Sequence, residues 1–177
     1  MTRLIGAIAL IACALAQPER ASALYHQNSV QYVGICYWLQ ADDGSRVTES
    51  QAKPDQRYSL HIRNNVAGFL SVWSIADGQQ LTPMPTPWVG FEMSPPGEFV
   101  VSGVFRIAPE NSPQGLFVLF GRSQTEHVKT VAEGLAKLER LKRAGQVTET
   151  VTEGADVGTY VVNPFGNQPA TTIKLMR

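Results

Sequence analysis

The sequence predicts a mostly β protein: an antiparallel β-sandwich of about eight strands with one helix in the C-terminal third. Short runs rich in β-branched and aromatic residues recur along the chain, as is typical of strands. Breaks containing Gly, Pro, Asn or Asp separate them and suit turns. Because the breaks are too short for crossover helices, most strands are expected to pair antiparallel. The predicted strands are residues 30–39, 58–63, 69–75, 88–93, 99–107, 116–120, 159–162 and 171–176.

The alternation of polar and apolar residues indicates which strands have a solvent-facing side. In the second predicted strand, Leu60 and Ile62 are expected to face the core, whereas His61 and Arg63 face solvent. Residues 116–120 are apolar at every position, which is typical of a central strand covered on both faces.

A helix is predicted from residue 125 to 144, after that central strand. Ser123 and Glu126 fit a capping box, in which a hydroxyl and a carboxylate accept hydrogen bonds from free amides at a helix start. Glu133 and Lys137 are spaced for an ion pair on the outer side of the helix. The apolar residues at helical spacing are Val128, Val131, Ala132, Leu135 and Leu138.

Residues 1–23 are predicted to be a signal peptide, which leaves residues 24–177 as a single exported domain. A basic start at Arg3 precedes an apolar run of 13 residues, and Ala21-Ser22-Ala23 fits the small-x-small pattern that signal peptidase accepts. The run is shorter than the roughly 20 apolar residues that a membrane-spanning helix needs. The predicted location is therefore the periplasm or the cell exterior.

Lipidation is the alternative route of processing. Leu10-Ile11-Ala12-Cys13 has the apolar-small-Cys form of a bacterial lipoprotein signal, in which Cys13 would carry the lipid. Cleavage after Ala23 would instead discard Cys13. Contact with a membrane is expected only for the lipidated form, because a lipid chain supplies the anchor.

Charge and cysteine content narrow the functional classes. Without residues 1–23 the chain keeps 13 basic and 14 acidic residues in a length of 154. This balance gives no long-range field that would attract nucleic acid, and the length suits one domain with one core. Cys36 would be its sole cysteine, so stability must come from packing without an internal disulfide.

One part of the chain has an order of short motifs that is similar to a known family. It runs Tyr58-Ser59-Leu60-His61-Ile62-Arg63-Asn64-Asn65, Gly68-Phe69-Leu70-Ser71-Val72-Trp73-Ser74-Ile75, Asp77-Gly78 and Leu81-Thr82-Pro83, and then Pro113-Gln114-Gly115-Leu116-Phe117-Val118-Leu119 with Ser123. This order resembles a bacterial family of exported domains of unknown function, family 4384, over about residues 55–125. In that family a strand with a polar end is followed by Gly-aromatic-Leu, a second strand, a Gly turn and a Leu-Phe-Pro element.

The resemblance implies a binding or assembly module without catalytic residues. Members of the family occur beside caspase-like peptidase domains and near type VI secretion components. The chain departs from the family in having Thr82 where Phe is usual, and in its helix and strands beyond Ser123.

The sequence contains no established motif for catalysis, a cofactor or a metal. The histidines His26, His61 and His127 form no His-x-His pair and no pair four residues apart. Cys36 lies in an apolar run with no basic neighbour, which predicts a buried, inert thiol. Because the nucleophile elbow, phosphate loop and dinucleotide fingerprint are also absent, we expect neither enzymatic activity nor a cofactor.

The proline-rich loop of residues 82–88 is the predicted partner-binding surface. Its three prolines at alternate positions favour an extended segment that presents Met84 and Trp88 at low entropic cost. The alternative is a rigid strap between two sheets, with Trp88 in the core, because large aromatic residues are mostly buried.

The sequence thus predicts an exported, non-enzymatic binding or assembly module of the cell envelope. We expect contact with another envelope protein through a sheet edge or the loop 82–88. One alternative is a glycan-binding sandwich in which Trp88 stacks on sugar rings. A further alternative is a small hydrolase whose site is assembled from Glu92, Glu98 and Glu110.

Overall fold

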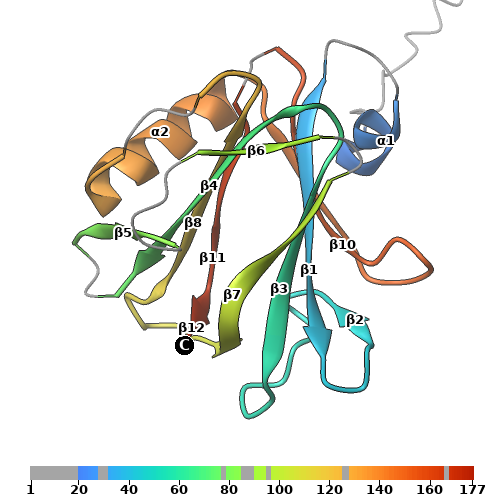
Figure 1. Cartoon of the computed structure of the whole chain (residues 1–177), viewed down its shortest axis with the longest axis vertical. Coiled ribbons are helices and arrows are strands. Elements are labelled where there is room, and N and C mark those ends of the chain that lie inside the picture. Colours follow the sequence, from blue (N-terminus) through green and yellow to red (C-terminus); the bar gives the residue numbers. More distant parts are fainter. Residues whose placement is uncertain are drawn as a thin grey trace, which may run out of the picture.

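The computed structural model describes residues 20–27, 32–76, 79–84, 90–94, 97–124, 128–165 and 168–177. Within these residues two antiparallel β-sheets pack face to face, and one helix covers the outer face of each sheet (Figure 1). The predicted fold class, a mostly β antiparallel sandwich, is therefore confirmed. The helices are α1 (Ala21–His26) and α2 (Val131–Arg143). In the described part of the chain, no helix has the length and apolar character needed to cross a membrane.

The two sheets differ in width. The larger has the order β12-β7-β3-β1-β10-β9, with β2 beside β1, and the smaller has the order β11-β8-β4-β5, with β6 beside β4. The larger sheet contains β1 (Val33–Ala41), β2 (Arg46–Val47), β3 (Tyr58–Asn64), β7 (Glu98–Ile107), β9 (Val147–Val151), β10 (Gly158–Asn163) and β12 (Leu175–Met176). The smaller contains β4 (Gly68–Ile75), β5 (Leu81–Pro83), β6 (Phe91–Met93), β8 (Gly115–Gly121) and β11 (Ala170–Ile173).

Every predicted strand overlaps an observed one, and the structure adds β2, β5 and β9. The predicted run 171–176 divides at Lys174 into two strands. Ile173 pairs with Leu116 in the smaller sheet, whereas Leu175 pairs with Ile107 in the larger one. The chain changes sheets at this point, so it closes one side of the sandwich.

The main core lies between the sheets. β3 alternates buried and half-buried residues along its length, with Leu60 and Ile62 in the core, as predicted. β8 is buried at every position, because the larger sheet covers one of its faces and α2 the other. The α2 side contains Trp73 of β4 with Phe117 of β8.

The short helix α1 packs on the outer face of the larger sheet. Ala21, Leu24 and Tyr25 are buried in a cluster with residues of β1 and β10, and the backbone N–H and the hydroxyl of Ser22 both donate to Glu149 (2.8 and 2.6 Å). The predicted leader boundary after Ala23 falls inside this helix, so a cut there would separate Ala21 and Ser22 from the cluster. Processing at that site stays a prediction.

The structure corrects the start of α2. The helix begins at Val131 and not at residue 125, and its capping box is formed by Thr130 with Glu133 in place of Ser123 with Glu126. Thr130 Oγ1 accepts from the Glu133 N–H (3.2 Å). Glu126 lies outside the described residues.

The delayed helix start has a physical cause in a pairing that precedes it. The Leu81 N–H donates to the Lys129 carbonyl oxygen (3.0 Å), and the Val131 N–H donates to that of Gln79 (3.0 Å). These bonds hold Thr130 in an extended conformation, with φ −119° and ψ 154°, so helical geometry starts only after it.

The packed face of α2 agrees with the prediction in part. Leu135 is 46% exposed, and Lys137, expected on the outer side, is buried. Val131 and Leu138, both predicted on the apolar face, do pack toward the smaller sheet, together with Leu141. Their spacing keeps them on one helix face once the helix starts at Val131.

Candidate functional site

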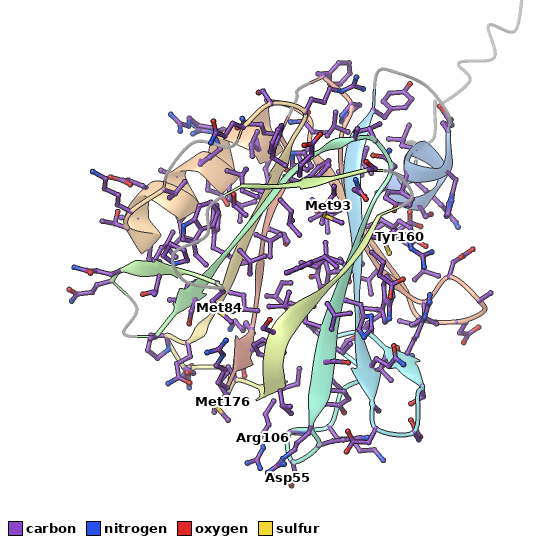
Figure 2. The ribbon with its side chains drawn as sticks, viewed as in Figure 1. Asp55, Met84, Met93, Arg106, Tyr160 and Met176 are labelled. Carbon is purple, nitrogen blue, oxygen red and sulfur yellow. The ribbon has the colours of Figure 1, made fainter. Side chains whose placement is uncertain are left out.

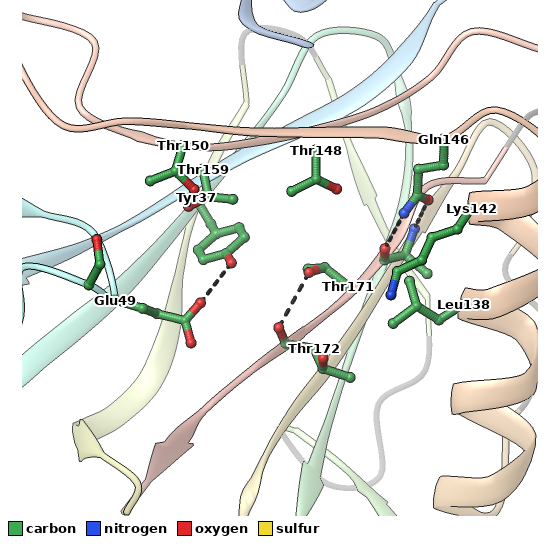
Figure 3. A pocket seen from close by; sticks show the side chains of 12 residues that line it. Tyr37, Glu49, Leu138, Lys142, Gln146, Thr148, Thr150, Thr159, Thr171 and Thr172 are labelled. Carbon is green, nitrogen blue, oxygen red and sulfur yellow. Dashed lines mark hydrogen bonds between the residues drawn. The ribbon is translucent and has the colours of Figure 1, made fainter. Parts of the chain in front are cut away.

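A groove of about 360 Å³ opens where the larger sheet extends past the edge of the smaller one (Figure 3). Strands β9 and β10 form one wall and β11 forms the other, while the C-terminal part of α2 closes one end. This volume is at the lower end of the range for ligand pockets, about 300–1,000 Å³. Five threonines dominate the lining: Thr148, Thr150, Thr159, Thr171 and Thr172.

The β9 wall presents hydroxyl groups. Thr148 and Thr150 are exposed on β9, and Thr150 Oγ1 lies 3.2 Å from Thr159 Oγ1 on the paired strand. A hydroxyl both donates and accepts hydrogen bonds, so this wall can pair with polar groups of either kind. Figure 3 shows the charged residues Glu49 and Lys142 at opposite ends of the groove.

Tyr37 and Glu49 form a fixed polar pair at one end. The Tyr37 hydroxyl donates to Glu49 Oε2 (2.8 Å), and the other carboxylate oxygen of Glu49 accepts from the Lys174 N–H (2.7 Å). Burial, and then the nearby Glu49 carboxylate, raise the pKa of Tyr37 far above its ordinary value. Tyr37 therefore remains a neutral donor at physiological pH.

The edge of β11 is already covered at both ends. The Gln146 side-chain amide donates to the Ala170 carbonyl oxygen and accepts from the Ala170 N–H (both 2.9 Å), as a neighbouring strand would. Glu49 accepts the Lys174 N–H at the other end. Side chains thus take the place of a further strand beside β11.

The edge of β9 is different, because no backbone partner covers it in the described residues. β9 has the sequence Val-Thr-Glu-Thr-Val, without the Pro or Lys that commonly protect edge strands. Just beyond the strand, Gln51 Nε2 donates to the Thr152 carbonyl oxygen (2.9 Å). A five-residue strand edge with unpaired N–H and C=O groups therefore lies beside the threonine wall.

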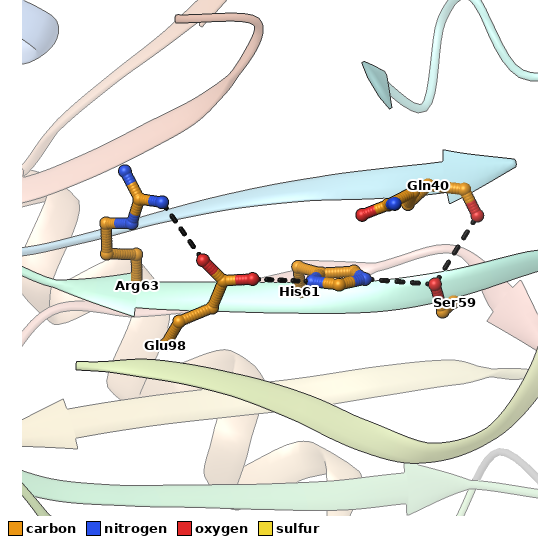
Figure 4. Close-up of polar contacts among 5 residues, drawn as sticks. All are labelled: Gln40, Ser59, His61, Arg63 and Glu98. Atoms are coloured by element: carbon orange, nitrogen blue, oxygen red, sulfur yellow. Dashed lines mark hydrogen bonds and ion pairs between the residues drawn. The ribbon is translucent and has the colours of Figure 1, made fainter. Parts of the chain in front are cut away.

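A second polar cluster lies on the outer face of β3 and β7 (Figure 4). Ser59 Oγ is 3.0 Å from His61 Nε2, and His61 Nδ1 is 2.9 Å from Glu98 Oε1. Arg63 donates to the other oxygen of Glu98 (3.0 Å). Although partial burial opposes it, the hydrogen bonds from His61 and Arg63 hold the pKa of Glu98 below its ordinary value.

Trp38 lies under this cluster. Its ring stacks on the His61 ring, with centroids 5.2 Å apart and planes 21° apart, and the guanidinium groups of Arg46 and Arg63 lie 4.2 and 5.2 Å from its centroid. His61 is on the outer face, as its alternation predicts, but its side chain is largely covered by these partners. The cluster is thus a fixed arrangement and not a set of free side chains.

The predicted partner-binding residues of the loop 82–88 are only partly described. Met84 is 6% exposed and packs in the main core, and its N–H donates to the Val72 carbonyl oxygen (2.7 Å). A partner cannot reach its side chain without a local opening. Trp88 lies outside the described residues, as does Cys13, so the binding and lipidation predictions stay predictions.

The predicted thiol and acid residues lie in separate places. Cys36 is a buried free cysteine, as predicted, and burial raises its pKa to about 11, which disfavours the reactive thiolate. Glu98 belongs to the His61 cluster, whereas Glu92 and Glu110 are exposed on β6 and after β7. Among the residues described, no group of three or more His, Cys, Asp or Glu side chains is placed to hold a metal ion.

Sequence reasoning missed the groove, because its lining comes from separate parts of the chain. Tyr37, Glu49, Thr150 and Thr171 are far apart in sequence, and only the sheet topology brings them together. The signal for β9 was present in the alternating Val147–Val151, where β-branched residues flank a polar centre.

Comparisons with known proteins found no relative of this chain. No family model matches the chain, and neither the curated proteins nor the solved structures contain a significant match.

Proposed function

We propose that the protein is an exported, non-enzymatic binding module of the cell envelope that captures an extended segment of another protein as an added strand on β9. The observation that carries this proposal is the unpaired edge of β9 beside the threonine-lined groove. Strand addition uses main-chain hydrogen bonds for affinity and pockets for alternate side chains for specificity. Both features are present at this edge.

The two faces of β9 have different surroundings. Thr148 and Thr150 line the groove, whereas Val147 and Val151 pack against the cluster under α1. Alternate side chains of an added strand would therefore enter the groove or lie on the α1 side. Hydroxyls, Glu49 and Lys142 in the groove favour small polar side chains on the captured segment.

Site-specific photo-crosslinking in envelope extract tests this proposal. A photoreactive amino acid at Thr150 is expected to crosslink one partner at one short segment, because that position faces the groove. The same amino acid at Thr82, which is exposed on β5 in the other sheet, is the matched control and is expected to give no such product. Specific crosslinks at Thr82 with none at Thr150 would move the interface to the proline loop.

A peptide segment suits the groove better than a glycan. Tyr37 is the single aromatic residue in the groove lining, and it is buried and bonded to Glu49. Protein sites for sugars commonly stack an exposed ring on the sugar, as the prediction for Trp88 assumes. The glycan alternative therefore depends on the loop 82–88 and gains nothing from the groove.

A second candidate function, hydrolysis, is favoured by one specific observation: Ser59, His61 and Glu98 form a hydrogen-bonded chain in the order of a nucleophile, a base and an orienting carboxylate. His61 Nε2 could accept the Ser59 proton while Glu98 holds the ring through Nδ1–H. Ser59 lies within a paired strand, however, opposite Gln40 of β1, so its surroundings are a sheet ladder and not a turn with free N–H groups that could stabilise an oxyanion. This places hydrolysis second to binding.

The hydrolase candidate has a direct test with p-nitrophenyl acetate. If the chain is catalytic, Ser59→Ala and His61→Ala each abolish turnover, while Ser45→Ala, an exposed serine outside the cluster, leaves it unchanged. We expect instead that all four proteins, wild type included, show only the background rate. Burst kinetics in the wild type that vanish in Ser59→Ala would overturn this expectation.

A further inference from the structure

A second groove, of about 470 Å³, lies at the end of the larger sheet where β12 meets β7. It is lined by Arg57, Val104, Arg106, Met176 and Arg177. Figure 2 shows Arg106 and Met176 together at this end of the molecule. The groove shares no lining residue with the threonine-lined groove.

The sheet register places like charges side by side. Tyr58 pairs with Phe105, and Met176 pairs with Arg106. Arg57 and Arg106 each lie one position beyond the Tyr58–Phe105 pair, and both line the groove. Because the side chains of Tyr58 and Phe105 are buried in the core, the next position on each strand faces outward. Like charges opposite each other across strands destabilise a sheet, so this placement has an energetic cost.

No side-chain carboxylate of the described residues forms an ion pair with Arg57, Arg106 or Arg177, although Asp55 lies at the same end of the molecule (Figure 2). Elsewhere, Arg63 is paired with Glu98 and Lys142 with Glu139. The formal net charge of the chain is zero, so the excess of positive charge is local to this groove.

The third arginine is held in position by the backbone of β7. Arg177 Nη2 donates to the Ser102 carbonyl oxygen (2.9 Å). Gly103 has a positive φ of 129°, and a Cβ at that position would lie 3.2 Å from Arg177 Nε. Glycine therefore allows both the backbone conformation and the close approach of the guanidinium.

We propose that this groove binds a phosphate ester. Guanidinium groups match phosphate oxygens with paired hydrogen bonds. Three arginines line this groove, and none of them forms an ion pair with a side-chain carboxylate of the described residues. The apolar wall of Val104 and Met176 fits a carbon-rich group next to the phosphate. This site is separate from β9 and goes beyond the proposed capture of a peptide segment.

Exposed apolar residues continue from the groove along β7. Val100 and Val104 are 47% and 56% exposed and share the outer face with Arg106. A phosphate ester with an acyl chain contacts such a surface, whereas a soluble ester uses the groove alone. The shared chemistry is the phosphate group, and the two sources can be separated experimentally.

The test uses the whole folded chain at low ionic strength, where charge interactions are least screened. In one arm, glycerol 3-phosphate is titrated and amide chemical shifts are followed by NMR. In the other arm, the protein is sedimented with vesicles of phosphatidylglycerol and phosphatidylcholine, or of phosphatidylcholine alone. The variant is R57Q/R106Q, and the matched control is R140Q/R143Q, which removes the same charge from exposed positions on α2.

The expected result is a set of amide shifts at Val104, Arg106 and Met176 with glycerol 3-phosphate, or sedimentation only with vesicles that contain phosphatidylglycerol. The affinity in that arm is expected to fall at least tenfold in R57Q/R106Q but not in R140Q/R143Q. Shifts with the soluble ester assign the groove to a soluble ligand, and sedimentation alone assigns it to a lipid headgroup. Equal shifts with acetate, an equal loss in both variants, or no binding in either arm would overturn the proposal. Unchanged circular dichroism of both variants excludes misfolding as the cause.

Discussion

Replacing Trp73 with alanine is expected to lower the free energy of unfolding by about 3–5 kcal/mol, the usual cost of deleting a buried Trp side chain. Trp73 of β4 is 0% exposed, and its side chain packs on the α2 side of the smaller sheet, with its ring centroid 5.6 Å from that of Phe117. The change would leave a cavity in the layer that holds α2 on the smaller sheet. Because domains of this size are stabilised by about 5–15 kcal/mol, the loss is a large fraction of the total.

Urea unfolding followed by circular dichroism measures this loss. The control is Phe165→Ala, since Phe165 is 85% exposed and its truncation is expected to change stability by less than about 0.5 kcal/mol. A loss of under about 1 kcal/mol for Trp73→Ala would contradict the packing of α2 on this sheet.

Replacing Thr150 with lysine is expected to weaken partner binding by about a hundredfold, which corresponds to about 3 kcal/mol. Thr150 is exposed and lines the groove, so a lysine there occupies the space that the captured side chains need. Binding would then displace the lysine or bury its charge, and inward-pointing charges are a natural means of blocking edge strands. The affinity for the crosslinked segment, prepared as a peptide, is measured by calorimetry.

The matched control is Thr82→Lys, which places the same charge on the edge strand of the smaller sheet. It is expected to bind the peptide as the wild type does. Comparable melting temperatures for both variants show that the fold is kept. A peptide affinity unchanged by Thr150→Lys would contradict capture at β9.

Local pattern was enough to predict most of the sheets. The alternation around Leu60 and Ile62 shows which face of β3 lies in the core, and the uniformly apolar sequence of β8 shows that both of its faces are covered. Both patterns depend only on neighbouring positions in the sequence. The predicted start of α2 was wrong, because two segments of the sequence, at Ser123 and at Thr130, fit a capping box. Only the tertiary bonds of Lys129 and Val131 to residues 79–81 select Thr130 over Ser123.

The candidate sites were harder to predict, because each depends on register between distant strands. The pairing of Arg63 with Glu98 across β3 and β7 brings Glu98 to His61. In the same way, the pairing of β10 with β9 brings Thr159 to Thr150. Sequence spacing alone does not specify such register. The predicted contact through a sheet edge or the loop 82–88 stays a prediction.

Hydrogen–deuterium exchange with and without the captured peptide tests strand addition at β9 most directly. Added main-chain hydrogen bonds are expected to slow exchange at alternate amides of Val147–Val151, while the amides of β5 remain unchanged. Slower exchange confined to residues 81–84, with none in β9, would contradict the account.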